Sequence, residues 1–210
     1  MFTFAMKMKL EAKICNKVEQ LFLRFGIKSV SMDDISHALG ISKKTLYQIV
    51  PNKAELISTI LGRVMADEVK LIEKLKEEAK DPIHELVLMA KHVTSLLKRV
   101  SPVAMYDLKK YYQDEWKAME SERSYLILND IKNNLEKGMR ENLYRDDLDP
   151  DLLADLYLRM ATFITDEKVF ERPESKREQL YNQFIKYHIR GISTTKGIRV
   201  LNKYENLLNS

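Results

Sequence analysis

The amino-acid sequence predicts an all-α protein, and three observations carry that prediction. Only six Gly and five Pro occur among the 210 residues, whereas an all-β sandwich or barrel needs a turn about every ten residues. Between the prolines, apolar side chains recur at the spacing of one helix face. We find no convincing strand, internal repeat or low-complexity segment.

The expected helices follow one another along the whole chain. The first covers about residues 10–25 and ends at Gly26, which suits the left-handed C′ position. After two short helices, a long one runs from Asn52 to about Lys80, or roughly 40 Å at 1.5 Å per residue. Asn52 with Glu55 three residues later forms a capping-box-like start. Further helices are expected at about 83–100, 103–119, 121–138, 150–170 and 174–191, with a short one in the tail 194–210.

The excess positive charge lies in the first quarter of the chain. Residues 1–55 hold nine Lys or Arg and five Asp or Glu, and the rest of the chain is neutral. This asymmetry indicates a small anion-binding head on a neutral body. A single Cys excludes a disulfide framework, and no apolar run approaches the roughly 20 residues of a membrane span. We therefore expect a cytoplasmic protein.

The segment Ser31–Val50 has the pattern of a helix-turn-helix. That motif needs two short helices crossing at a tight turn, with Gly at the turn and a small residue at the crossing; Gly40 and Ser36 meet these needs. The first residue of the segment forms a capping box with Asp34, and Ser42 is an N-cap for the second helix. The apolar positions of the shared core are filled by Ile35, Leu39, Ile41, Leu46 and Ile49.

The second helix of this motif leaves a polar face free. Lys and Tyr side chains suit phosphate oxygens, and Lys44 and Gln48 carry donors that can reach base edges. A hairpin used only for packing is the alternative, and the full set of turn, core and cap signals disfavours it. The free face consists of Lys43, Lys44, Thr45, Tyr47 and Gln48.

Over about residues 10–57 the sequence resembles the tetracycline-repressor (TetR) family of bacterial transcriptional regulators. The resemblance rests on the order and spacing of Leu21-Phe22-x-x-Phe25-Gly26, Ser29–Ile35, Gly40–Tyr47 and Asn52-Lys53-x-Glu55-Leu56. The sequence departs from the family at Val50, where an aromatic residue is usual, and at Lys44, where a small residue is common. The first change softens the packing under the recognition helix, and the second adds a cation at the DNA surface.

The resemblance implies particular DNA contacts. Ser31 and Tyr47 would bind phosphates, and Thr45 would lie at the backbone or at a base edge. Lys43 and Lys53 would bind phosphate through their charge, and Lys53 would have a helix N-terminus behind it. Together with the free face and the N-cap, the expected DNA-binding residues are Ser31, Ser42, Lys43, Lys44, Thr45, Tyr47, Gln48 and Lys53.

The resemblance also implies two domains, a helix-turn-helix DNA-binding head over 1–51 and a larger helical effector-binding and dimerisation domain over 52–210. The segments that begin at Leu152 and Leu180 are apolar over more than half their circumference, which is typical of helices buried on two faces. In a two-fold dimer, paired heads about 34–36 Å apart would read a palindromic operator; a deeper monomeric core is the alternative. The expected interface residues are Leu156, Met160, Phe163, Leu180, Phe184 and His188.

A cluster of aromatic and Met residues is the best candidate for an effector pocket. Tyr and Trp combine a large apolar ring with one hydrogen-bonding group, and the flexible Met side chain adapts to ligands of different shapes. Ordinary core is the competing interpretation. The cluster lacks cations, which favours an apolar or aromatic effector. A ligand that shifts the long fourth helix would change the distance between the two heads, so that they no longer match successive major grooves. We therefore expect a repressor that a ligand releases from DNA. The candidate pocket residues are Met89, Val93, Leu97, Tyr106, Tyr112, Trp116, Met119 and Tyr125.

Two other classes of function compete with a DNA-binding regulator. One is a helical small-molecule-binding protein whose DNA-binding head is vestigial. The other is an enzyme, which we do not expect because the sequence shows no nucleophile–base pair and no phosphate-binding loop. The four His residues form no i,i+4 pair, so neither a metal nor a cofactor is expected. The expected partners are double-stranded DNA, a small molecule and a second copy of the chain, with no membrane, and the protein would associate with the nucleoid when bound to DNA.

Overall fold

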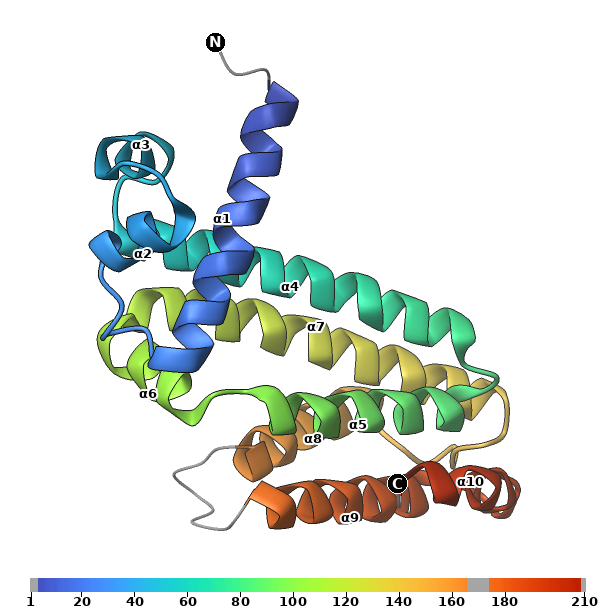
Figure 1. The fold of residues 1–210 in the computed structure, drawn as a ribbon. Helices are drawn as coiled ribbons and strands as arrows, with labels where there is room; N and C mark the ends of the chain where they lie inside the picture. Colours follow the sequence, from blue (N-terminus) through green and yellow to red (C-terminus); the bar gives the residue numbers. More distant parts are fainter. Residues whose placement is uncertain (1–3, 166–173, 209–210) are drawn as a thin grey trace. The chain divides into compact units, whose positions relative to one another are not determined.

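The computed structural model describes residues 4–165 and 174–208, and these ranges contain ten helices and no strand (Figure 1). The fold is all-α, as the sequence predicts. The expected helix at 150–170 is observed to residue 165, and its last residues lie outside the described ranges. The helices are α1 (Phe4–Phe25), α2 (Met32–Leu39), α3 (Lys43–Ile49), α4 (Lys53–Glu78), α5 (Pro82–Arg99), α6 (Pro102–Tyr111), α7 (Gln113–Arg140), α8 (Pro150–Thr165), α9 (Glu174–Ile192) and α10 (Thr195–Leu208).

The break between α6 and α7 differs from the prediction. The sequence pattern suggests helices at 103–119 and 121–138, but the chain leaves helical geometry at Tyr112 (φ −131°, ψ 54°) and α7 continues through residue 120. The amide of Tyr112 still donates to the carbonyl of Leu108 at 3.1 Å. Its ring and that of Trp116 pack against a hydrophobic core. Tertiary packing therefore sets this break, since no Pro or Gly marks it.

The described helices form two compact units. Unit 1 contains the residues up to Glu68 together with Val100–Ser121, and unit 2 contains Val69–Arg99 together with the residues from Glu122. Helix α6 and the start of α7 therefore belong with the N-terminal helices. The division into functional domains at residue 51 stays a prediction. The fully buried core of unit 1 includes Ile14, Val18, Ile35, Leu46, Leu56 and Ile57.

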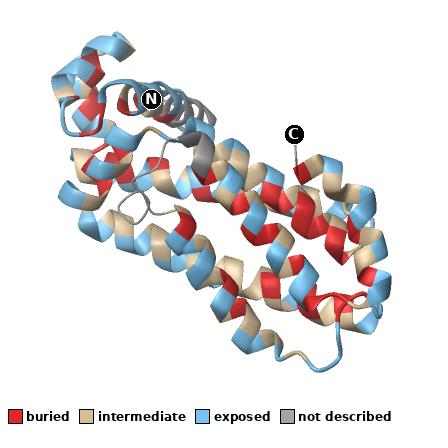
Figure 2. Cartoon of the chain, turned by 90° about the horizontal axis from the view of Figure 1, so that it is seen from below, coloured by how far each residue is buried: buried red, intermediate tan, exposed pale blue. Residues whose placement is uncertain are grey.

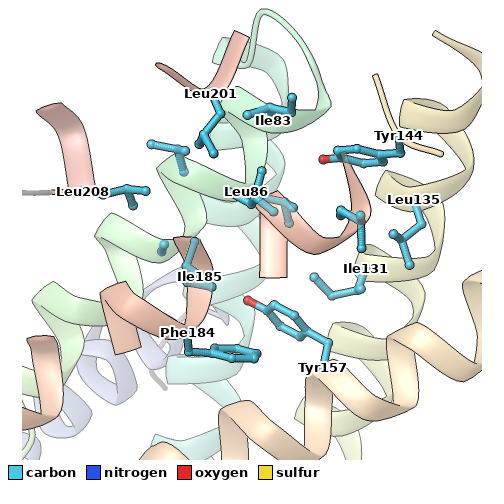
Figure 3. Packing of buried hydrophobic residues seen from close by; sticks show 14 of the residues in the cluster. Ile83, Leu86, Ile131, Leu135, Tyr144, Tyr157, Phe184, Ile185, Leu201 and Leu208 are labelled. Carbon is cyan, nitrogen blue, oxygen red and sulfur yellow. The ribbon is translucent and has the colours of Figure 1, made fainter. Parts of the chain in front are cut away.

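Unit 2 is built around α5, which packs against α9 and α10. Figure 3 shows Ile83 and Leu86 of α5 among side chains from α7, α8, α9 and α10. Buried residues recur on the inward sides of these helices, and exposed residues occupy the outer sides (Figure 2). The C-terminal tail, whose role the sequence leaves open, forms α10 and buries Leu201 and Leu208 in this core.

Two buried hydrogen bonds hold the C-terminal part of α7 in unit 2. The hydroxyl of Tyr144 donates to Oδ1 of Asn134 at 3.0 Å, and Nδ2 of Asn134 donates to the carbonyl of Pro82 at 2.9 Å. The Tyr144 ring lies directly on Gly138, where a Cβ would come within 2.0 Å of it. The close approach of ring and backbone therefore requires glycine at this position.

Candidate nucleic-acid interface

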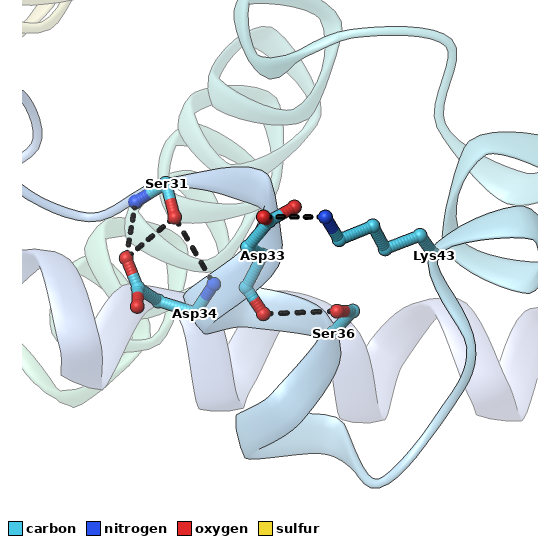
Figure 4. A network of polar contacts seen from close by, with 5 residues as sticks. All are labelled: Ser31, Asp33, Asp34, Ser36 and Lys43. Carbon is cyan, nitrogen blue, oxygen red and sulfur yellow. Dashed lines mark hydrogen bonds and ion pairs between the residues drawn. The ribbon is translucent and has the colours of Figure 1, made fainter.

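Helix α2 begins with the capping box that the sequence predicts (Figure 4). The amide of Asp34 donates to Oγ of Ser31 at 3.1 Å, and the amide of Ser31 donates to Oδ2 of Asp34 at 2.8 Å. The Ser31 hydroxyl also donates to that carboxylate at 2.6 Å. These hydrogen bonds hold the pKa of Asp34 below its usual value, because they favour the ionised form.

The turn and the start of α3 also follow the prediction. Gly40 closes α2 in the left-handed region at φ +65°, where glycine carries no steric penalty. The Ser42 side chain caps α3 by accepting the amide of Thr45 at 3.0 Å, and the two hydroxyls lie 2.8 Å apart. Both N-caps satisfy amides that would otherwise have no partner within the helix.

A small apolar core holds the two helices of the motif together. Ile35 of α2 and Leu46 of α3 are fully buried, and Ser36 is 3% exposed at the helix crossing. The Ser36 hydroxyl donates to the carbonyl of Asp33 at 2.9 Å, so this buried polar group is satisfied. Val50 is buried at the end of α3. The remaining apolar positions of the motif, Leu39, Ile41 and Ile49, are partly buried against the same core.

The outward face of α3 carries most of the predicted contact residues. Lys43, Lys44, Tyr47 and Gln48 are exposed, and Tyr47 is 49% exposed. The face presents two ammonium groups, a phenol and an amide, which are donors suited to phosphates and base edges. Lys43 already has a partner in the free protein, the carboxylate of Asp33 on α2 (Figure 4).

Lys53 is directed toward the chain's own backbone. Its Nζ donates to the carbonyls of Ile27 and Val30, in the loop between α1 and α2, at 2.5 Å each. Burial lowers the pKa of Lys53, and the negative charges of Asp107 and Asp34 oppose that shift. An ammonium has three N–H groups, so two bind the loop and one is left for a phosphate. Its predicted phosphate contact stays a prediction.

The residues of the predicted effector pocket are divided between the two units. Tyr106, Tyr112, Trp116 and Met119 belong to unit 1, where Tyr112 and Trp116 pack against the core and Tyr106 is exposed. In unit 2, Val93 and Leu97 pack against the core, Met89 is buried and Tyr125 is exposed. The pocket itself stays a prediction.

The predicted dimer residues fall into two groups within unit 2. Leu156, Met160 and Phe163 of α8 are 40–55% exposed, and they lie on one side of the helix because residues three and four apart share a face. Phe184 is buried and Leu180 is partly buried in the core of the unit. The ring of His188 lies edge-on to that of Tyr157, with centroids 5.0 Å apart.

Sequence reasoning missed two residues that contact elements of the DNA-binding head. Asp33 pairs with Lys43, and Asp107 accepts the backbone amide of Lys28 at 2.8 Å. The acidic residue at the start of α2 could have suggested the first pair. Nothing local could have suggested the second, because 79 positions separate its residues.

Comparison with known proteins agrees with this architecture. The family described as bacterial regulatory proteins, tetR family, matches residues 17–60. The uncharacterized HTH-type transcriptional regulator YvaF of Bacillus subtilis is 25% identical over 134 residues, covering 62% of this chain and 68% of its own. The HTH-type transcriptional repressor KstR2 of Rhodococcus jostii is 24% identical over 152 residues, covering 69% of this chain and 72% of its own.

Solved structures share the whole fold. A transcriptional regulator from Cytophaga hutchinsonii superposes with a TM-score of 0.70 at 18% identity, over 87% of this chain and 98% of its own. A gamma-butyrolactone receptor (ArpA-like protein) does so with a TM-score of 0.69 at 18% identity, over 97% and 98% of the two chains. A helix-turn-helix head on an all-α body defines a DNA-binding transcriptional regulator. Residues 17–60 match the TetR family of these regulators, and the whole chain shares the fold of solved TetR-family regulators.

Proposed function

We propose that this regulator is a dimeric repressor that binds a palindromic operator through α3 and leaves it when a small molecule binds. The observation that carries the proposal is the outward face of α3. Lys43, Lys44, Tyr47 and Gln48 stand exposed on a helix whose other side is locked into the head by Leu46. A rigid helix with exposed donors suits insertion into a major groove.

The residues around α3 support contacts to the DNA backbone. The Ser31 hydroxyl caps α2, and the Thr45 hydroxyl lies 2.8 Å from the Ser42 hydroxyl that caps α3. Both hydroxyls therefore lie near a helix N-terminus, which favours a phosphate. Lys53 has one N–H group left beyond its two loop carbonyls. Lys44 and Gln48 are the side chains proposed to reach base edges, since both are exposed on the outward face of α3 and carry hydrogen-bond donors.

An apolar stripe on α8 supports dimerisation. Leu152, Leu156, Met160 and Phe163 are 69%, 55%, 40% and 49% exposed, and their spacing places them along one helix face. An exposed row of large apolar side chains marks a protein–protein interface more often than it marks free surface. A two-fold pairing of this stripe would bring two heads to one operator, which is the arrangement a palindrome requires.

A buried orphan group in unit 2 supports small-molecule binding. Nε2 of His188 is buried and has no hydrogen-bond partner among the described residues. The imidazole lies among the rings of Tyr157 and Phe184. An apolar or aromatic effector with one hydroxyl or carbonyl would satisfy this nitrogen and cover the surrounding rings. The structural relatives include a receptor named for a gamma-butyrolactone, and we propose a comparably small, uncharged class of effector here.

Selection from a random-sequence DNA pool followed by fluorescence anisotropy tests the proposal. The selected duplexes should contain an inverted repeat and should bind two protein chains. Lys44→Ala should weaken binding and lower the slope of log affinity against log salt by about 0.9 if Lys44 neutralises one phosphate, or relax sequence preference if it reads a base. Lys91→Ala removes the same charge from an exposed site on α5 and serves as the control. Equal binding to all duplexes would favour a ligand-binding protein with a vestigial head.

A further inference from the structure

Two charged side chains from distant parts of the sequence hold the loop between α1 and α2. Asp107 of α6 accepts the amide of Lys28 on Oδ2 at 2.8 Å. From the start of α4, Nζ of Lys53 donates to the carbonyls of Ile27 and Val30. The carboxylate of Asp107 therefore binds one backbone N–H of the loop, and the ammonium of Lys53 binds two of its backbone carbonyls. We call Asp107 and Lys53 the loop clamp; both residues belong to unit 1.

The carboxylate side of the clamp is tightly enclosed. Asp107 is 7% exposed, and α6 packs against α1 beside it. A Cβ on Gly26 would lie 2.9 Å from Oδ2 of Asp107 and 2.9 Å from Cγ1 of Val103. Gly26 also has φ +82°, which other residues rarely adopt. The absence of a side chain at Gly26 therefore lets the backbone lie close to the carboxylate of Asp107.

Burial of a carboxylate is costly unless it is hydrogen-bonded or paired. Asp107 has both kinds of compensation, because it binds the Lys28 amide and its charge acts favourably on Lys53. A hydrophobic side chain would pack into α6 without that cost. We therefore infer that the carboxylate of Asp107 does more than fill space: it fixes the position of the Lys28 amide in the loop.

The loop leads directly into the DNA-binding motif. Val30, whose carbonyl binds Lys53, precedes Ser31, the N-cap of α2. Helix α2 then carries α3 through the packing of Ile35 and Leu46. We propose that Asp107 is a positioning residue for operator recognition: by holding the loop at Lys28 it sets where α2 begins and so where α3 meets the DNA. This inference rests on the proposed function.

Substitution of Asp107 has two possible effects on DNA binding, one from the loss of its charge and one from the loss of its contact with the loop. Removal of a negative charge from a DNA-binding head should raise its affinity for any DNA, because fewer like charges oppose the phosphates. Loss of a positioning contact should instead lower affinity for the specific site while leaving binding to other sequences in place. The two explanations therefore predict opposite signs for the same substitution.

The experiment compares the full-length wild type with Asp107→Ala and Asp114→Asn on two duplexes. Asp107→Ala removes both the charge and the acceptor that binds the Lys28 amide. One duplex is selected by the wild type from a random pool, and the other is a scrambled sequence of the same composition. Asp114→Asn removes the same charge from an exposed site in unit 1. We expect Asp107→Ala to weaken binding to the selected duplex by about tenfold or more without weakening binding to the scrambled one. Asp114→Asn should weaken neither.

The inference is overturned if Asp107→Ala binds the selected duplex as well as Asp114→Asn does, or if it weakens binding to both duplexes equally. Circular dichroism melting first establishes that each variant folds. Gly26→Ala, which presses a Cβ against the same carboxylate, provides a second test; unchanged selectivity in this variant would also overturn the inference. A wild type with no preference between the duplexes would instead reject the proposed function itself.

Discussion

Nζ of Lys43, the first residue of α3, lies 2.5 Å from Oδ2 of Asp33 on α2, so the helix proposed to face DNA begins with an ion pair. Both side chains are more than half exposed, and such pairs contribute little to folding stability. We expect a larger effect of this pair on DNA binding, because a phosphate that approaches Lys43 must compete with a carboxylate already in contact with it.

Asp33→Asn should therefore tighten DNA binding. We expect a gain of a few-fold, roughly 3- to 10-fold at low salt, on any sequence, because Lys43 is released and one repelling charge is lost. Anisotropy titrations over a range of salt concentrations measure this gain, with Asp114→Asn as a control for the charge change alone. If Asp33→Asn binds more weakly than that control, the ion pair orients Lys43 for DNA and does not compete with it.

Gly138→Ala should destabilise the protein strongly. The new Cβ would lie 2.0–2.2 Å from ring carbons of Tyr144, and relief would break the bond from that hydroxyl to Asn134. We expect a loss of about 2–4 kcal/mol in the free energy of unfolding by urea denaturation. Gly191→Ala, where a Cβ meets no described atom within 4 Å, should leave stability unchanged or slightly higher. Equal effects of the two substitutions would contradict this account of the α7 end.

His188 should make unit 2 sensitive to mild acid. Burial lowers the pKa of His188 from 6.5 to about 4, so the folded protein keeps it neutral while the unfolded chain takes up a proton below pH 6.5. Proton uptake by the unfolded state lowers stability as pH falls from 6.5 to about 4. At about 1.4 kcal/mol for each pH unit, the contribution is roughly 2 kcal/mol between pH 7 and 5.

Urea unfolding of the wild type and His188→Leu at pH 7, 6 and 5 tests this contribution. The difference in free energy of unfolding between the two proteins should shift by that amount in favour of the variant as the pH falls. The value at pH 7 is the internal reference for any packing effect of the substitution. A difference that stays constant across the three pH values would show that His188 does not titrate differently on folding.

The DNA-binding motif could be predicted closely because its signals are local. Ser31, Gly40 and Ser42 act within three residues of themselves through caps and a left-handed turn, and such chemistry can be read from a short segment. The break at Tyr112 could not, since it depends on packing rather than on Pro or Gly. The bond from Lys28 to Asp107 joins distant positions, and one sequence shows no pattern that pairs them.

The sequence predicted only in part which faces of α8 and α9 are buried. The apolar residues of α8 and α9 indicate helices with broad apolar surfaces, but periodicity does not say which part a core will cover. The structure buries Tyr157 and Phe184 in unit 2 and leaves Leu156 and Phe163 outside. That division depends on how α5 and α9 pack together, which is a tertiary property.

Leu156→Glu should separate the dimer without unfolding the chain. Leu156 lies in the middle of the exposed α8 stripe and is 55% exposed, so a carboxylate there is tolerated in a single chain but is desolvated when two stripes meet. Light scattering coupled to gel filtration should then give the mass of one chain. Operator affinity should fall sharply, because each chain alone presents one reading head.

Leu71→Glu makes the same change on α4, at a side chain that is 37% exposed and outside the stripe, and should remain dimeric with normal operator binding. A dimeric Leu156→Glu variant would move the interface away from α8. A monomeric variant that still bound the selected duplex at full affinity would break the link between pairing and operator recognition, since a palindrome read by one head gains nothing from its second half-site.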